Sequence, residues 1–504
     1  MDYKESDPEK QNKLDRDFGD KQNSDMHDFN YYKDLFSNYI ADSDQSRYIS
    51  ALDAITHLID MNVDEAMDII FEIDIIKILL EHFTFDFPDI VTKSLLVFNE
   101  IASSEKYGQQ LWNLEFITYI VQWFEISDDF YVYSLIFELI STLIKSSKQN
   151  YCFLLNTTFV AVFGTKLNTI PILSANTQHL RDFYLSLYQF YKYLYRYKKI
   201  RLPDPYFRDI PTFLFAILPY APLELVEFIL NPMMTMIEKH RATLGCLFIR
   251  PKHFEVLCKL LETMHQFEDE NDEFYETAEE ISRELCVILQ FIFDTNQDDD
   301  VNLSIDDLID YNFYEILKQT IEIFPSITSH ILEIIGDLVA LKRIPSPEIP
   351  MFFLSLADSS LNMEQKNSFA FLFFACSQKL GSHFCEYVFE NIDMIDGILE
   401  ILYTQEKNCV YNIMNGIIYL VDTATKLGFD LKFFQNKLEE QDITEDFIDD
   451  TQEMYEEDDD IYETCQRFLK LYETGEASID DEFDENDIPV GGFVFSINDR
   501  KWSV

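Results

Sequence analysis

The stretch that decides the fold is EIASSEKYGQQLWNLEFITYIVQWF, residues 100–124. An apolar segment ends at Ile101 and Ala102, a polar turn follows, and a new amphipathic segment begins at Leu114. Apolar residues at helical spacing on both sides of a short polar turn predict two consecutive helices. The same order of helix, turn and helix returns along the chain, so we predict an all-α protein built from helical repeats.

Four segments share one pattern. Their first, third, fourth, seventh, eighth and eleventh residues are apolar, and their second residue is an acid. The fourth, seventh, eighth and eleventh positions lie on one face of an α-helix, and the early acid suits its positive N-terminal end. The spacing of the four segments fits units of about 46 residues, and we expect roughly eight to ten such units. The segments are Ile73–Phe83, Leu114–Phe124, Phe254–Met264 and Ile392–Leu402.

More apolar helices are expected between these amphipathic ones. Tyr131–Lys145 and Asn367–Leu380 are apolar nearly all round, which predicts that they are buried between neighbouring helices. One exposed and one buried helix in each unit is the arrangement of a solenoid.

The quoted stretch resembles the junction between armadillo repeats. Glu100-Ile101-Ala102-Ser103 is similar to the Asn-Ile-Ala-Ser-like helix end of that family, and Asn113-Leu114 to the Gly-led start of its next helix. The resemblance is clearest from about Asp44 to Leu180. It implies a right-handed α-solenoid of armadillo/HEAT-like repeats. Importin-alpha-like members grip basic peptides with a ladder of Trp and Asn, but Leu96 and Glu100 stand at the matching positions here, so we do not expect that kind of cargo binding.

Composition predicts three regions. Residues 1–28 are polar with little periodicity and are expected to be a disordered N-terminal arm. Residues 29–436 carry the helical patterns and are expected to form the solenoid. Residues 437–504 are expected to be an acidic, largely disordered tail with a short helix at Ile461–Tyr472 and an apolar end at Ile488–Val504.

The net charge of −52 bounds the partners. It argues against nucleic-acid binding, which needs Lys and Arg to displace counterions, and anionic membranes should repel the chain. It favours a protein partner, such as a basic or extended peptide, or simply solubility. Eight cysteines without a CxxC motif suit a reducing compartment, and the N-terminus has no apolar core of a signal peptide. We therefore expect a cytoplasmic or nuclear location.

A basic group in this acidic chain has two interpretations. Lys192, Arg196 and Lys199 share one helix face, and a second basic group falls about one repeat later. They could form a docking strip for an acidic segment, a phosphopeptide or a nucleic acid, with the acidic tail folding back onto it. The interpretation that we favour is a solvated helix face with tyrosines packed beneath, because runs of charge usually face water. The strip consists of Lys192, Arg196, Lys199, Arg201, Lys239 and Arg241.

No motif predicts catalysis. The sequence lacks GxGxxG, P-loop, GxSxG and HExxH patterns. Cys376, His383 and Cys385 lack a fourth ligand at the spacing of a metal site. We therefore expect no enzyme activity, cofactor or metal. The sequence favours a protein–protein interaction scaffold that binds an extended partner segment along a solenoid groove; the alternative is a regulatory subunit of a phosphatase or kinase complex.

Overall fold

The computed structural model describes most of the chain between residues 29 and 474. The described residues are 29–42, 44–82, 87–104, 106–112, 114–155, 159, 162–163, 166, 177–194, 212–248, 251–269, 272–295, 309, 311–342, 344, 346–355, 361–391, 393–456 and 458–474. They form α-helices and short 3-10 helices, with no β-strand among them. The chain divides into two compact units: Met1–Phe213 with Asn498–Val504 is unit 1, and Leu214–Ile497 is unit 2. The sequence predicts no division within 29–436.

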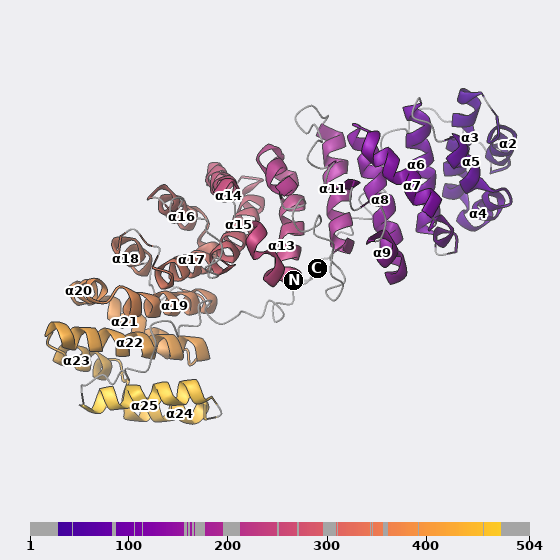
Figure 1. Cartoon of the computed structure of the whole chain (residues 1–504). Helices are drawn as coiled ribbons and strands as arrows, with labels where there is room; N and C mark the ends of the chain where they lie inside the picture. Colours follow the sequence, from indigo (N-terminus) through magenta and orange to yellow (C-terminus); the bar gives the residue numbers. More distant parts are fainter. Residues whose placement is uncertain are drawn as a thin grey trace. The chain divides into compact units, whose positions relative to one another are not determined.

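Unit 1 is built on a row of neighbouring helices, each packed against the next (Figure 1). We call this row the first layer of unit 1. Its members, in order of contact, are α2 (Phe29–Tyr39), α3 (Gln45–Met61), α6 (Pro88–Ser103), α8 (Phe130–Ser146) and α11 (Thr177–Leu194). The connecting elements are α4 (Val63–Phe71), α5 (Ile75–His82), η1 (Gly108–Leu111), α7 (Leu114–Ile126) and α9 (Lys148–Leu155).

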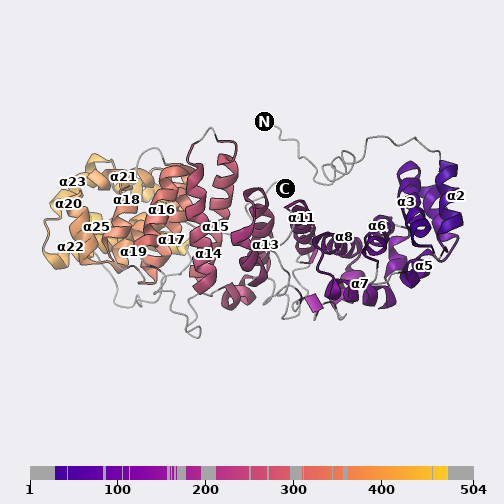
Figure 2. The same ribbon diagram turned by 90° about the horizontal axis from the view of Figure 1, so that it is seen from above.

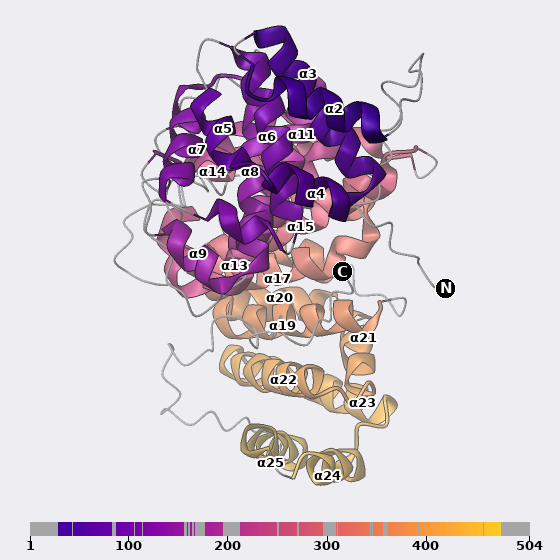
Figure 3. The same ribbon diagram turned by 90° about the vertical axis from the view of Figure 1, so that its right-hand side faces the viewer.

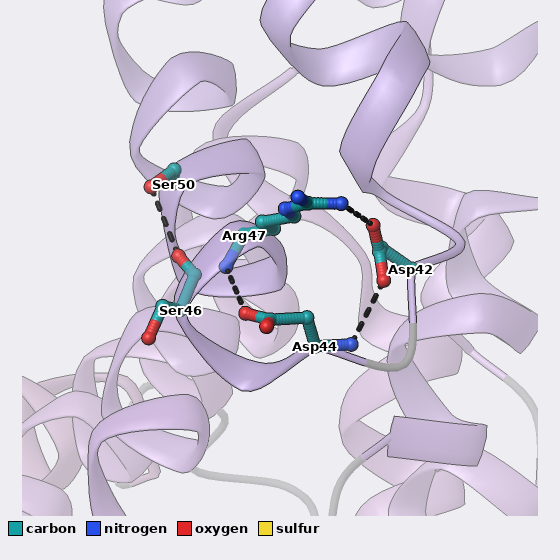
Figure 4. Close-up of polar contacts among 5 residues, drawn as sticks. All are labelled: Asp42, Asp44, Ser46, Arg47 and Ser50. Carbon is teal, nitrogen blue, oxygen red and sulfur yellow. Dashed lines mark hydrogen bonds and ion pairs between the residues drawn. The ribbon is translucent and has the colours of Figure 1, made fainter.

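Helix α3 begins where the resemblance to armadillo repeats begins. Asp44 is its N-cap, and the side chain of Asp44 accepts a hydrogen bond from the Arg47 amide at 3.1 Å (Figure 4). Asp42 Oδ1 accepts from the Asp44 amide at 2.9 Å, while Asp42 Oδ2 accepts from the Arg47 guanidinium at 3.3 Å. Because the first amides of a helix have no partner within the helix, these carboxylates fix the point at which α3 starts.

Unit 2 has two layers. Its first layer is again a row in which each helix packs against the next: α13 (Leu223–Phe248), α15 (Tyr275–Thr295), α17 (Thr328–Ala340), α19 (Met363–Lys379), α22 (Lys407–Leu427) and α25 (Asp459–Thr474). Figure 3 shows α19, α22 and α25 one below another, with α21, α23 and α24 beside them. The second layer is made of α14 (Pro251–Met264), α16 (Tyr311–Ile323), α18 (Glu348–Leu354), α20 (Ser382–Glu390), α21 (Asp393–Leu402), α23 (Lys432–Glu440) and α24 (Glu445–Met454).

The two classes of predicted helix fall where the sequence places them. The amphipathic segments correspond to α5, α7, α14 and α21, none of which belongs to a first layer, and α7 begins at the predicted Leu114. The apolar segments correspond to α8 and α19, which lie inside the first layers. Most side chains of α8 and α19 are buried, because a first-layer helix is flanked on both sides and covered on a third.

The first layers are packed differently in the two units. In unit 1, Phe137 of α8 is fully buried, and its ring centroid lies 5.5 Å from that of Phe124 and 5.3 Å from that of Phe190. In unit 2, Gly336 and Gly416 lie against phenylalanine rings of α19. A Cβ atom at Gly336 would stand 2.5 Å from Phe371 Cε1, and one at Gly416 would stand 2.6 Å from Phe373 Cε1. Glycine therefore allows helices of unit 2 to approach closely.

The helical packing continues past the boundary predicted at 436. That position lies inside α23, and α24 and α25 follow, so residues up to 474 differ from the predicted, largely disordered tail. The reason is that apolar side chains recur among the acids at helical spacing and are buried; they are Ile443, Ile448, Ile461, Phe468 and Leu471. The predicted helix at Ile461–Tyr472 lies within α25. The predicted N-terminal arm, 1–28, and residues 475–504 lie outside the described residues.

Candidate interaction surface

Among the described residues, no helix packs over one side of the first layer of unit 2, and we call this side the open face. Helix α17 shows how it arises, because α15 and α19 flank it and α18 covers a third side. Between residues 327 and 340, every side chain of α17 is buried except Glu333. Glu333 therefore marks the open face. Partly exposed residues of the neighbouring first-layer helices include Glu284, Gln290, Gln378, Tyr411 and Tyr419.

Glu333 connects three helices of the open face. Its Oε2 accepts a hydrogen bond from Gln290 Nε2 of α15 at 2.8 Å. Its Oε1 accepts from Ser368 Oγ of α19 at 2.9 Å. These bonds hold the side chains of successive helices in one orientation, so this part of the face is ordered before any partner arrives.

Aromatic rings occupy the open face at α19 and α22. The Phe374 centroid lies 6.2 Å from that of Tyr411 and 6.0 Å from that of Tyr419. Gln378 Nε2 donates to the Tyr419 hydroxyl at 3.4 Å. Burial raises the pKa of Tyr411, and the negative charge of nearby Asp460 raises it further. Such rings offer a large apolar contact area with a polar edge.

Asn415 links α22 to α25. Its Nδ2 donates to Thr464 Oγ1 at 3.1 Å, and Arg467 Nη1 donates to its Oδ1 at 3.4 Å. Asn415 is almost fully buried, and both ends of its amide have partners. This pairing fixes how α25 docks on the row.

The α15 end of the open face is acidic. Glu284 is partly exposed, but its Oε2 atom is buried and has no hydrogen-bond partner within the described chain. Burial raises the pKa of Glu284 well above its usual value, and the charges of Glu227 and Glu280 raise it further. Arg283 opposes this shift but is itself ion-paired with Glu280. A carboxyl in such surroundings keeps its proton to a higher pH than an ordinary glutamate does.

The corresponding face of unit 1 is mixed in charge. Lys93 of α6 is ion-paired with Asp53 of α3, and the Lys145 ammonium lies 5.5 Å from the centroid of the Tyr193 ring. Asn99 turns inward and donates from Nδ2 to the Leu135 carbonyl of α8 at 3.0 Å. Unit 1 thus carries both lysines and carboxylates on this face.

The positions compared with importin-alpha-like proteins lie on this mixed face. Leu96 and Glu100 are both partly exposed on α6. Trp123 is buried in α7, outside the first layer.

Of the residues in the predicted basic strip, only Lys192 has a side chain whose position the structure describes. Lys192 is exposed in the last turn of α11, and the neighbouring Tyr191 is buried. Arg196, Lys199 and Arg201 lie outside the described residues. Lys239 and Arg241 belong to α13, but the positions of their side chains are not described. The strip stays a prediction.

The described residues contain neither a metal-binding cluster nor a single membrane-spanning helix. Cys376 and Cys385 are buried and His383 is exposed, and among the described residues no three His, Cys, Asp or Glu side chains are grouped so that they could hold a metal. No single described helix has the length and apolarity to cross a membrane. Two consecutive helical segments, Asn312–Ile323 and Pro325–Ala340, reach that length and apolarity only when they are taken together. The chain bends by 119° between them.

Neither a protein-family model nor a curated protein sequence matches this chain. Solved structures do match it. One is an engineered protein, 10% identical with a TM-score of 0.51, and the match covers 90% of this chain and 100% of that one. Another is a structure of Kap95p binding to RanGDP, 12% identical with a TM-score of 0.49, covering 90% and 61% of the two chains. A third comes from work on the interaction between cadherin and beta-catenin, 10% identical with a TM-score of 0.44, covering 92% and 95%.

At such low sequence identity, these matches show similarity of fold alone. The two matches with TM-scores below 0.5 support no further conclusion. The stacked layers and the first match show an all-α solenoid, so the predicted fold class is confirmed.

Proposed function

Because the chain has the armadillo-like helical-repeat fold, we propose that it is a non-catalytic scaffold that binds an extended segment of another protein along the open faces of its first layers. The observation that carries the proposal is the open face of unit 2. There, side chains from successive helices are linked to one another and still partly exposed. Stacked repeats offer such a face to a ligand that runs from one helix to the next.

The residues of this face suit an extended peptide. Tyr411 and Tyr419 provide apolar anchors that lose little conformational freedom on binding. Gln290 and Gln378 each carry an amide that donates and accepts, which matches the polar groups of a peptide backbone. We expect affinity to come from these anchors together with charge complementarity.

Affinity purification of the full chain from a cell extract tests the proposal. The double variant Tyr411→Ala/Tyr419→Ala should lose at least about tenfold of its partner affinity, equivalent to about 1.4 kcal/mol. The matched control is Tyr220→Ala, because Tyr220 is exposed in η3 (Leu218–Tyr220), away from the aromatic part of the open face. Circular dichroism verifies that the variants stay helical.

Recovery of no specific protein partner, or equal loss in the double variant and the control, would overturn the proposal. A phosphatase or kinase that co-purifies in a one-to-one ratio would favour the alternative of a regulatory subunit.

A further inference from the structure

Three carboxyl groups gather where α13 meets α15 in unit 2, two helices that lie side by side (Figure 2). Glu227 is exposed on α13, while Glu280 and Glu284 are one turn apart on α15 and therefore on the same side of that helix. The Glu284 Oε2 atom is buried without a hydrogen-bond partner among the residues described. An unsatisfied buried carboxyl oxygen is costly, so something outside the described fold is expected to complete it.

The cations and donors nearby are already engaged. Arg283 is ion-paired with Glu280, and Asn231 Nδ2 donates to Glu227 Oε1 at 3.3 Å. The charged groups that act on Glu284 are Glu227 from α13 and Glu280 and Arg283 from α15 itself. Within the described part of α14 and α17, no further charged group acts on it. The cluster therefore keeps an excess of negative charge that the described residues do not neutralise.

We propose that the cluster of Glu227, Glu280 and Glu284 receives a lysine or arginine side chain from a basic, extended partner segment. The inference rests on the proposed function, because it names the chemistry of the ligand that the open face accepts. Charge complementarity selects this occupant: the cluster is acidic, and the chain as a whole carries −52. A long cationic side chain can also reach a carboxyl whose residue is only partly exposed, because its apolar stem tolerates burial.

Binding of this kind releases a proton. In the free protein, burial and the neighbouring carboxylates favour the protonated form of Glu284. An arriving ammonium or guanidinium favours the carboxylate, so the Glu284 carboxyl gives its proton to solvent as the ion pair forms. The affinity for a basic segment should consequently rise with pH while Glu284 is protonated in the free protein.

Isothermal titration calorimetry of the full chain with an oligolysine peptide tests the inference. Titrations in two buffers with different ionisation enthalpies count the protons released. The wild type should release protons, and Glu284→Gln should release fewer and bind about tenfold more weakly. The control Glu255→Gln removes the same charge from the second-layer helix α14, where Glu255 is exposed. It should behave like the wild type.

Equal proton release by wild type and Glu284→Gln would overturn the inference. So would equal weakening in both variants, which would show attraction by net charge alone. The proposed function fails separately, when no specific protein partner is recovered by the full chain. If a partner is recovered and binds the Glu284→Gln variant as tightly as the wild type, the proposed cation site is wrong. The proposed scaffold function would not be affected by that result.

Discussion

The two units hold their first layers together in different ways. In unit 1, rings fill the space between helices: Phe137 of α8 meets Phe124 of α7 and both Phe183 and Phe190 of α11, with centroids between 5.3 and 5.9 Å away. In unit 2, Gly336 and Gly416 remove the side chain so that a neighbouring ring reaches the backbone. The stability of unit 1 is therefore sensitive to a loss of side-chain volume, and the stability of unit 2 to added side-chain volume.

The open faces differ as well. The face of unit 1 pairs lysine with aspartate and with tyrosine, as at Lys93 and Lys145. The face of unit 2 concentrates carboxylates at α15 and tyrosines at α22. The same repeat architecture thus presents two surfaces of different chemistry.

The largest expected effect is in the aromatic cluster. Phe137→Ala should destabilise unit 1 by about 3–5 kcal/mol, because a fully buried ring is replaced by a cavity. Urea unfolding followed by tryptophan fluorescence measures it, since Trp112 and Trp123 belong to unit 1; Trp502→Phe provides the background. Phe137→Leu should cost less. Equal costs for both variants would mean that ring volume does not hold this layer.

Adding one methyl group in unit 2 should have the next largest effect. Gly416→Ala places Cβ 2.6 Å from a buried ring, and overpacking of this kind costs about 1–3 kcal/mol. The buried thiols of Cys409 and Cys465 should then be labelled faster, because burial raises the pKa of each to about 12 and protects it in the native state.

The second variant Phe373→Leu should partly relieve the clash at Gly416→Ala, which a double-mutant cycle detects as a coupling between the two sites. If the effects of the two substitutions on the free energy of unfolding simply add, the Phe373 ring is not the group that requires glycine at position 416.

The pH dependence of unit 2 should report on Glu284. Its pKa is raised in the folded state above the unfolded value of about 4.3, so the stability it contributes is full below that value and is lost as pH rises through the folded pKa. Within that window the loss is about 1.4 kcal/mol for each pH unit.

Glu284→Gln should flatten this slope and stabilise unit 2 at pH 8, as urea midpoints between pH 5 and pH 8 would show. Glu255→Gln should leave the slope unchanged. If the pH dependence of stability is unchanged in Glu284→Gln, another titrating group causes it.

The smallest expected effects come from two ion pairs of nearly equal length. Lys106 Nζ lies 2.8 Å from Asp68 in unit 1, where both side chains are mostly exposed. Lys437 Nζ lies 2.9 Å from Asp396 in unit 2, where both are more buried. Lys437→Met should lower the urea midpoint more than Lys106→Met does, because water screens the exposed pair. Urea midpoints at low and high salt compare them, and a larger loss at Lys106 would contradict this order.

Several features of the fold could be predicted because they depend on local spacing. The start of α7 at Leu114 follows from the apolar period after a polar turn. The assignment of α8 and α19 to the buried layer follows from apolar residues on all sides. The end of the helical region could not be predicted correctly from the sequence and was placed at 436. Acids dominate the composition of residues 437–474, and they obscure the few apolar residues that pack there, such as Ile448 and Phe468.

The sequence by itself determined the helical class, the two kinds of helix and the acidic balance of the chain, because periodicity and charge are properties of neighbouring residues. Only the tertiary structure decided which side chains meet. Gln290, Glu333 and Ser368 are far apart in the chain and join through stacking, and Glu284 is distinguished from the many other acids only by what surrounds it. Burial and contacts between repeats depend on how the helices stack, and no local pattern encodes that.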